Sequence, residues 1–558
     1  MKENNPFIYE AATNLTPEKI EELYIDIEKS DLIVSQKNLF VEGYRGSGKS
    51  MLLKYNSFDM KYHRDKQVNF IGIYTSCQTA LFSKKEYELL DNKLHSLIIA
   101  EHILVLTMTE SLLTSLLNMK LLNEKEEIEF IEEIEFYFDF NDYSLSKFIK
   151  FIKKELISLQ KNMNINPLEF YQNAFTYSSL IIPIITALKE VIKLKNSHFS
   201  FFIDDGQNLS DIQKEILNSW ISFRDTSSVS FKVSIASRKE YKFYTNTNSV
   251  ILENHDYMVL DLEKEFFGQD SRFYKFAKNV IEKRLEKYSI NTTDAKLFFP
   301  EHDKFKKELK EISERFINGE YPERKDKSKE YRKKNVSKYN RAIYFRERLE
   351  NSKANNPTIP YTGFETLTNI STGIIRNLLV PCTLMYSREL QDNEEINFIN
   401  AKTQYEAIKD LSESKWVELK SLSSTITDCD EDTANKIFIF LTNFGNKLKA
   451  ILLDKTSSEK QILTFTIEKL ENDVNKKEIQ HILTIAEKAG LIYSRIGAGK
   501  NSNRTTWYTP NRILWSSIGL DPVGQNGRLN ITPYNFINMT KRVIEYTDIN
   551  KKGLFDDI

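Results

Sequence analysis

The chain contains the stretch Gly43-Tyr44-Arg45-Gly46-Ser47-Gly48-Lys49-Ser50, which has the G-x-x-x-x-G-K-S spacing of a phosphate-binding loop. Residues 38–42 before it predict a short strand, and residues 51–55 after it predict the start of a helix. Glycines let backbone N–H groups wrap phosphates, and the helix N-terminus adds a favourable field. We expect Lys49 to reach the β- and γ-phosphates and Ser50 to ligate Mg²⁺, so the stretch predicts an ATP site.

A pair of carboxylates far downstream is the expected second half of this site. Residues 199–203 form a near-continuous apolar run, typical of a buried parallel strand, and end in Asp204-Asp205. Ligands of open α/β sheets bind at the carboxyl ends of the strands. We therefore predict that Asp204 belongs to the Mg²⁺ shell and that Asp205 orients or deprotonates the attacking water, although an acidic turn after a core strand is the alternative. Aspartate reaches less far than the glutamate more often found there, so hydrolysis is expected to be slow.

The composition restricts the class of protein. The 558 residues suffice for roughly two to four domains. The 78 Lys and Arg residues nearly balance the 79 Asp and Glu residues, so any nucleic-acid binding has to come from a local basic patch. The three cysteines lack zinc-ligand spacing and favour a reducing compartment. No signal peptide is apparent, and the apolar residues 96–117 are interrupted by charged residues, which predicts a core helix and a cytoplasmic protein without membrane association.

The order of elements predicts an α/β core followed by helices. Further strands are expected at residues 68–74, 231–236 and 257–262, and strands that alternate with helices imply a parallel sheet. Residues 16–29 predict a helix, and residues 79–196 predict a long helical insertion. The expected domains are a nucleotide-binding core at 1–263, a helical region at 264–400 and a C-terminal domain at 401–558.

Two charged stretches leave alternatives open. Residues 321–348 combine many Lys and Arg with interleaved tyrosines, which suits a nucleic-acid track as well as a solvated basic loop. Residues 124–140 of the insertion are acidic with interleaved aromatic residues. They predict a solvated amphipathic helix, or else a surface for docking a partner.

The C-terminal third has the pattern of a winged helix. A helix is expected at residues 477–489, closed by Gly490, and two strands are expected at 491–496 and 505–509. The loop between the strands carries Lys500 and Arg504. The exposed face of the helix is predicted to be polar (Lys477, Gln480, His481, Thr484 and Lys488). Such a domain either binds DNA or docks a protein, and DNA is the preferred interpretation.

Together these features resemble the AAA+ ATPases of the origin-recognition and replication-initiator type. In that resemblance Ile203-Asp204-Asp205 is the Walker B end, and Ser237, after the strand at 231–236, is the polar sensor 1. Arg376 in Gly373-Ile374-Ile375-Arg376 is sensor 2, which belongs to a helical lid and contacts the γ-phosphate. The family also implies an arginine that acts on a neighbour's nucleotide, for which Arg238 and Arg224 are the candidates.

The resemblance implies an ATP-dependent switch that couples ATP binding and hydrolysis to DNA or to a partner. The resemblance is closer to a bacterial subgroup of these ATPases, whose members often lie in phage-defence loci. Similarity to that subgroup implies a homo-oligomer and a separate effector protein. A DNA-loading or replication-initiation ATPase of a plasmid or transposon is one alternative. A scaffold that binds ATP without hydrolysing it is another.

Overall fold

The structure is a computed structural model, in which the chain folds into two compact units. It describes residues 5–8, 12–77, 86–135, 137–138, 144–165, 174–222, 228–239, 241–262, 270–351, 360–393, 395–426, 428–455, 462–498, 504–524 and 527–545. The core unit is Glu10–Leu262, and the C-terminal unit combines Met1–Tyr9 with Glu263–Ile558.

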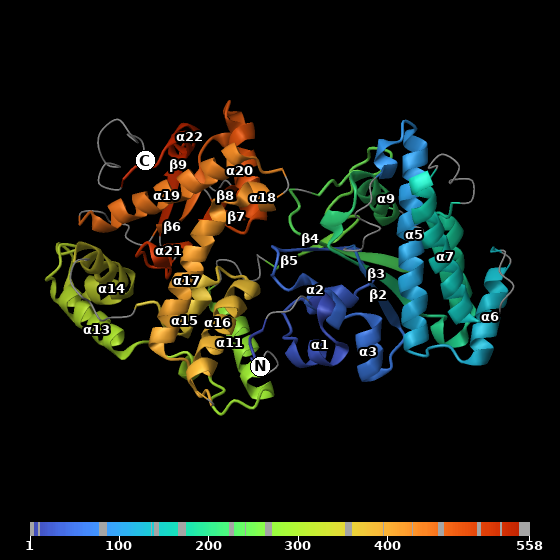
Figure 1. Cartoon of the computed structure of the whole chain (residues 1–558), viewed down its shortest axis with the longest axis horizontal. Coiled ribbons are helices and arrows are strands. Elements are labelled where there is room, and N and C mark those ends of the chain that lie inside the picture. Colours follow the sequence, from blue (N-terminus) through green and yellow to red (C-terminus); the bar gives the residue numbers. More distant parts are fainter. Residues whose placement is uncertain are drawn as a thin grey trace. The chain divides into compact units, whose positions relative to one another are not determined.

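A five-stranded parallel sheet forms the centre of the core unit (Figure 1). The strand order is β2-β3-β4-β1-β5, and the strands are β1 (Leu39–Glu42), β2 (Phe70–Ser76), β3 (His198–Asp204), β4 (Val229–Ile235) and β5 (Met258–Asp261). All residues of β1, β3 and β4 are buried, as the apolar runs predicted. Because the strands are parallel, their carboxyl ends meet at one edge of the sheet, and the phosphate loop follows β1 there.

Helices cover this sheet and fill the insertion between β2 and β3. The helices of the core unit are α1 (Pro17–Leu23), α2 (Lys49–Tyr55), α3 (Phe58–Asp65), α5 (Lys93–Asn118), α6 (Glu124–Glu135), α7 (Leu145–Ile165), α8 (Ile182–Glu190) and α9 (Asp211–Ser222). In the acidic helix α6 the side chains of Phe130, Ile131 and Ile134 are buried. This is the amphipathic helix that the pattern predicted, and residues 136, 139 and 140 of that stretch lie outside the described part.

Helix α5 is long and apolar enough to cross a membrane, the one such helix in the described part of the chain. Within the core unit, however, it packs against α7, α9 and β2 (Figure 1). Leu104, Leu112 and Leu116 on it are at most 2% exposed, so its apolar character is explained by burial in the core.

His102 on α5 makes the stability of the core unit sensitive to acid. Burial lowers the pKa of His102 from 6.5 to about 4, and the backbone N–H of Phe175 donates to its Nδ1 at 2.9 Å. The neutral form is thus favoured in the fold, while the unfolded chain takes up a proton below pH 6.5. Stability is therefore expected to fall as the pH drops from 6.5 towards 4, by about 2 kcal/mol at pH 5. Urea unfolding at pH 7 and pH 5 measures this loss.

His102→Asn is the matched variant, because its Oδ1 can still accept from Phe175 but does not titrate in this range. We expect this variant to lose about 2 kcal/mol less than the wild type between the two pH values. Equal losses in both proteins would show that His102 is not the acid-sensitive group.

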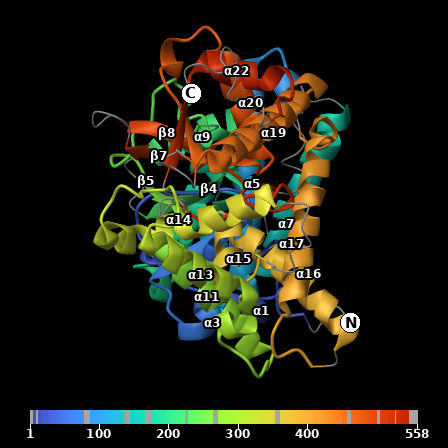
Figure 2. The same cartoon turned by 90° about the vertical axis from the view of Figure 1, so that its left-hand side faces the viewer.

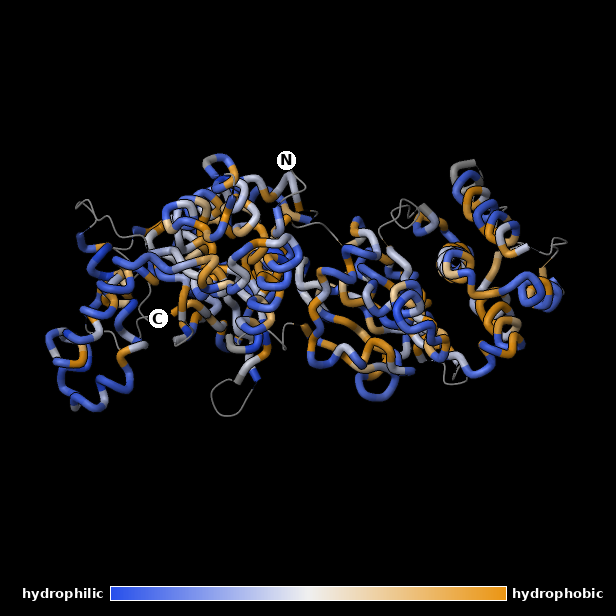
Figure 3. Tube along the Cα trace, turned by 90° about the horizontal axis from the view of Figure 1, so that it is seen from below, coloured by the Kyte–Doolittle hydropathy of each residue, from blue (hydrophilic) through white to orange (hydrophobic). Residues whose placement is uncertain are grey.

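The C-terminal unit begins with a helical region. Its helices are α11 (Asp270–Lys287), α12 (Ala295–Phe298), α13 (Asp303–Asn318), α14 (Lys329–Glu350), α15 (Phe364–Ile370), α16 (Ile375–Asp392), α17 (Ala401–Leu419) and α18 (Leu422–Thr425). Helices α13 and α14 lie against each other as a hairpin (Figure 2). The trace of this hairpin is mostly hydrophilic (Figure 3).

A winged-helix arrangement closes the chain. It consists of α19 (Glu431–Leu453), β6 (Ile462–Ile467), α20 (Lys476–Lys488), the antiparallel hairpin of β7 (Ile492–Ala498) and β8 (Arg504–Pro510), α21 (Leu514–Ser517), β9 (Gly527–Ile531) and α22 (Pro533–Lys541). Helix α20 buries Ile479, Ile482 and Leu483 and ends before Gly490, whose φ is +65°. The predicted polar face is exposed at Lys477, Gln480, His481 and Lys488 and half-buried at Thr484.

Two expectations about the N-terminal region were wrong. The predicted helix at 16–29 ends at Leu23, because Tyr24 is extended, stacks on Tyr55 and donates to Asp26 at 2.8 Å. Residues 5–8, expected in the core at 1–263, belong to the C-terminal unit instead. There the amide of Asn5 donates to the Thr383 carbonyl at 3.0 Å, and the ring of Phe7 packs on aromatic residues (Phe298, Phe299 and Tyr386).

Candidate nucleotide-binding site

The phosphate loop joins β1 to α2 and holds its lysine in place. Lys49 is the first residue of α2 and only 6% exposed, and its Nζ donates to the carbonyl oxygens of Gly43 and Tyr44, the latter at 3.2 Å. Gly46 and Gly48 have φ of +90° and +102°, a region that L-residues seldom adopt. The loop therefore needs glycine at both positions. The buried ammonium group of Lys49 is held by the loop's own carbonyl oxygens.

Close packing also explains Gly43. A Cβ at this position would lie 2.6 Å from Oγ of Ser47 and 3.3 Å from Cβ of Leu262. The Ser47 hydroxyl is buried and has no hydrogen-bond partner in the structure. An unsatisfied buried hydroxyl next to an ammonium group and the N-terminus of α2 fits a site that accepts phosphate oxygens.

Asp204 is oriented by two hydroxyl groups from neighbouring strands. It is fully buried at the end of β3, where Tyr74 OH donates to Oδ2 and Ser234 Oγ donates to Oδ1, both at 2.6 Å. Burial, and then the charge of Asp204, raise the pKa of Tyr74 above its usual range, so the phenol stays a donor. Each carboxylate oxygen retains a second lone pair, which leaves Asp204 able to contribute to a Mg²⁺ shell.

Asp205 has an unusual backbone conformation. Its φ and ψ are 57° and 46°, in the left-handed region where aspartate and asparagine are the more tolerated non-glycine residues. Its N–H donates to Ser234 Oγ at 2.8 Å, and Gln207 Nε2 donates to its Oδ1 at 2.8 Å. A Cβ on Gly206 would lie 2.7 Å from Cγ1 of Val233. The two carboxylates therefore have different partners, which are Tyr74 and Ser234 for Asp204 and Gln207 for Asp205.

Arg238 binds carboxylates of its own chain. Its Nε donates to Glu42 Oε2 at 2.6 Å, and its Nη1 donates to Glu253 Oε2 at 3.0 Å. The Arg238 N–H also donates to Glu42 at 2.7 Å, so the loop that carries Ser237 is fixed beside the end of β1. An action of Arg238 on a neighbouring subunit would require these ion pairs to break. The other candidate, Arg224, lies outside the described residues.

Arg376 is placed only within the C-terminal unit. It lies half-buried in the first turn of α16, directly after a turn in which Thr372 and Gly373 have φ of 55° and 80°. A position on the first turn of a helix suits a group that meets an anion. Its predicted contact with a γ-phosphate stays a prediction.

Sequence reasoning missed Tyr74, Ser234 and Glu42. Tyr74 and Ser234 hold Asp204, and Glu42 holds Arg238. One available signal was the alternation of Ser230, Lys232 and Ser234 along an otherwise apolar strand, which places polar groups on one face. Assigning Ser234 to Asp204 also required the pairing of β3 with β4, which aligns Ile203 with Val233.

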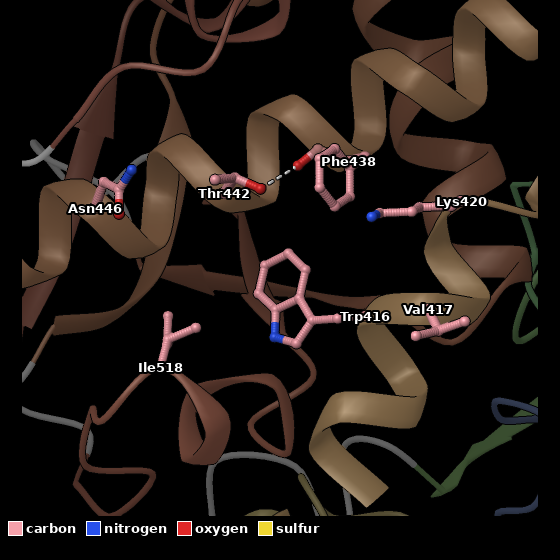
Figure 4. Close-up of a pocket in the computed structure, with 7 residues that line it drawn as sticks. All are labelled: Trp416, Val417, Lys420, Phe438, Thr442, Asn446 and Ile518. Atoms are coloured by element: carbon pink, nitrogen blue, oxygen red, sulfur yellow. Dashed lines mark hydrogen bonds between the residues drawn. The ribbon is translucent and has the colours of Figure 1, made fainter. Parts of the chain in front are cut away.

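The described part of the chain shows no second group of residues arranged as a catalytic or metal-binding site. No cluster of three His, Cys, Asp or Glu side chains there could hold a metal ion, and the three cysteines are buried and free. A pocket of about 290 Å³ in the C-terminal unit is lined by Trp416, Val417, Lys420, Phe438, Thr442, Asn446 and Ile518 (Figure 4). Lys420 is the single charged residue of this lining, so the pocket lacks an acid–base pair.

The fold and the site define a P-loop ATPase core of the AAA+ class, since the phosphate loop and the acidic pair follow strands of one parallel sheet. The chain belongs to the ORC-CDC6-like family, whose profile matches residues 5–531. This match confirms the predicted origin-recognition type of ATPase. A comparison with curated protein sequences returned no match.

Three solved structures are similar to the chain at low identity. The Aeropyrum pernix ORC2 protein in ADPNP–ADP complexes is 9% identical and has a TM-score of 0.30, with 90% of this chain and 92% of that chain covered. The Aeropyrum pernix ORC1 protein in complex with DNA is 8% identical (TM-score 0.31), with 93% and 96% covered. Cdc6p from Pyrobaculum aerophilum is 9% identical (TM-score 0.30), with 92% and 97% covered. The family assignment rests on the profile match.

Proposed function

We propose that this protein binds ATP with Mg²⁺, hydrolyses it slowly and uses the nucleotide state to control its engagement with DNA. The observation that carries the proposal is the convergence of a buried Lys49 and a buried, doubly hydrogen-bonded Asp204 at the carboxyl edge of one sheet. Membership of the ORC-CDC6-like family supports a nucleotide as the ligand of this site. A buried lysine and a buried carboxylate at one edge suit a ligand that carries both phosphates and a divalent cation.

In this proposal the chain's residues position and neutralise charge, with no covalent step. Lys49 and the N–H groups from Gly46 to Ser50 hold the phosphates, while Ser50 and Asp204 hold the Mg²⁺ ion. The ion supplies charge neutralisation to the phosphate oxygens. Asp205 orients or deprotonates the water, and Ser237 supplies a further hydrogen bond. Arg376 supplies positive charge from the lid.

Only some of the cationic side chains of the basic stretch at 321–348 are exposed and available to a DNA surface. Arg332 is 8% exposed and donates to backbone carbonyls, including that of Ile317 at 3.0 Å. Arg346 forms a buried ion pair with Glu323, and Arg341 binds Asp521 at 2.7 Å. The lysines of α14 are exposed instead (Lys329, Lys333, Lys334 and Lys338). We assign DNA contact to these lysines together with the polar face of α20 and the wing, whose Lys500 lies outside the described residues.

DNA binding is testable through its salt dependence. Replacing Lys329, Lys333, Lys334 and Lys338 with Gln should make the log–log salt slope less negative by about 0.9 for each DNA phosphate that the variant no longer neutralises. Duplex binding is measured with ATP between about 50 and 200 mM salt, a range over which affinities that depend on phosphate contacts fall steeply. If no duplex binds at low salt, the winged helix is a protein-docking module.

The neighbouring helix offers a matched control. Lys304, Lys306, Lys307 and Lys310 of α13 are also exposed but are interleaved with glutamates, and their replacement by Gln changes the net charge equally. The control variant should keep the wild-type slope. The same shift in both variants would assign the effect to net charge and would remove α14 from the DNA surface.

For the biological role, we propose the sensor or regulator ATPase of an antiphage system, acting in the cytoplasm as a homo-oligomer with a separate effector protein. The sequence resemblance to a bacterial subgroup of these ATPases, whose members often lie in phage-defence loci, supports this role. An adjacent nuclease or toxin gene would agree with it, whereas origin repeats or a transposase gene would favour the DNA-loading alternative.

A further inference from the structure

The turn that leads into α16 has a strained backbone. Thr372 has a φ of 55° and is 4% exposed, and Gly373 follows with a φ of 80°. A β-branched residue in the left-handed region is an outlier, with a cost of roughly 1–3 kcal/mol. Such a conformation persists only where the surroundings hold it. Arg376, the candidate for γ-phosphate contact, lies four residues after Thr372.

Residues of the winged helix hold this turn. The N–H of Arg512 donates to Thr372 Oγ1 at 3.1 Å, and its Nη1 donates to Asn369 Oδ1 at 2.8 Å. Arg512 itself is 6% exposed and lies two residues after the end of β8. The strained turn is therefore fixed by a segment that is 140 residues distant in sequence.

A second connection runs through one tyrosine. Asn377, next to Arg376, donates to Tyr493 OH at 2.8 Å and to the Ser371 carbonyl at 3.2 Å. On the other side, Asn511 donates to Tyr493 OH at 3.4 Å and to the Gly490 carbonyl at 3.0 Å. Gly490 closes helix α20, and Tyr493 is 3% exposed on β7. The hydroxyl of Tyr493 thus links the end of α20 to the first turn of α16.

We propose that Tyr493 is a positioning residue that couples the ligand on α20 to the orientation of Arg376. A duplex held by the exposed face of α20 would shift Gly490 and Asn511, and Tyr493 passes this shift to Asn377 and the strained turn. This inference rests on the proposed function, because it connects the proposed DNA surface with the proposed γ-phosphate contact. Coupling is reciprocal, so ATP alters DNA affinity by the same factor by which DNA alters ATP affinity.

The test is Tyr493→Phe, which removes the hydroxyl and keeps the buried ring. In the wild type, saturating duplex should change the ratio of ATP to ADP affinity by about 5- to 150-fold, the usual range of allosteric coupling. In Tyr493→Phe this factor should approach one, while nucleotide-free DNA binding stays within about threefold, since no phosphate contact is removed. Tyr508→Phe, on the adjacent β8 and 8% exposed, is the matched control and should keep the wild-type factor.

A double-mutant cycle of Tyr493→Phe and Asn377→Ala should show non-additive effects on the factor, because the two groups share one hydrogen bond. An unchanged coupling factor in Tyr493→Phe overturns the inference. If the wild type binds ATP and duplex independently of each other, the inference and the proposed control of DNA engagement by the nucleotide both fall, while the proposed ATP and DNA binding stand. If the wild type binds no duplex, the DNA part of the proposed function falls as well.

Discussion

Replacing Lys49 with alanine is expected to abolish ATP binding at micromolar concentrations. The buried ammonium now donates to the carbonyls of Gly43 and Tyr44, and bound phosphates would take these interactions over. Hydrogen bonds to charged groups contribute roughly 1.5–3 kcal/mol each, and Lys49 is expected to donate to both the β- and γ-phosphates, so the combined loss should be about 100-fold or more in affinity. Isothermal titration of wild type and variant with ATP and Mg²⁺ measures this difference.

Lys19→Ala is the control for this experiment. Lys19 is exposed on α1 of the same unit, so its removal changes the charge equally without touching the loop. It should bind ATP within about threefold of the wild type, as surface charges contribute little. Unchanged ATP affinity in Lys49→Ala would remove the loop from the nucleotide site.

Asp205→Asn is expected to keep ATP binding and to lower the turnover number by about 100-fold or more, the usual contribution of a positioned acid or base. Asparagine tolerates the left-handed backbone of this position and can still accept the hydrogen bond from Gln207. The substitution therefore removes the charge near the water without adding backbone strain. Single-turnover and steady-state phosphate release measure the effect.

Asp204→Asn provides the contrast. Its amide would replace an oxygen that now accepts from Tyr74 or Ser234, so it should weaken Mg²⁺-dependent nucleotide binding as well as turnover. Wild-type turnover in Asp205→Asn would place the base elsewhere. Nucleotide binding without any turnover in the wild type would favour the non-hydrolysing scaffold.

Local patterns were sufficient for much of the fold. The loop from Gly43 to Ser50, the apolar strand before Asp204 and the helix that Gly490 closes were all predictable, because each depends on residues close together in sequence. The class of α/β fold followed from these elements and is confirmed by the parallel sheet. The predicted helix at 16–29 failed in its second half, where Tyr24 stacks on Tyr55, a contact that no local pattern reports.

Spacing and residue type were enough to predict the phosphate loop, the acidic pair and the family, because these signals lie in short stretches of the chain. The polar groups that hold these residues, and the charges that face solvent, depend on three-dimensional packing between distant segments. Tyr74 reaches Asp204 across 130 positions, and Arg341 reaches Asp521 across 180. Arginines that looked alike in the basic stretch thus differ in role, because burial and ion pairing depend on what the fold places beside them.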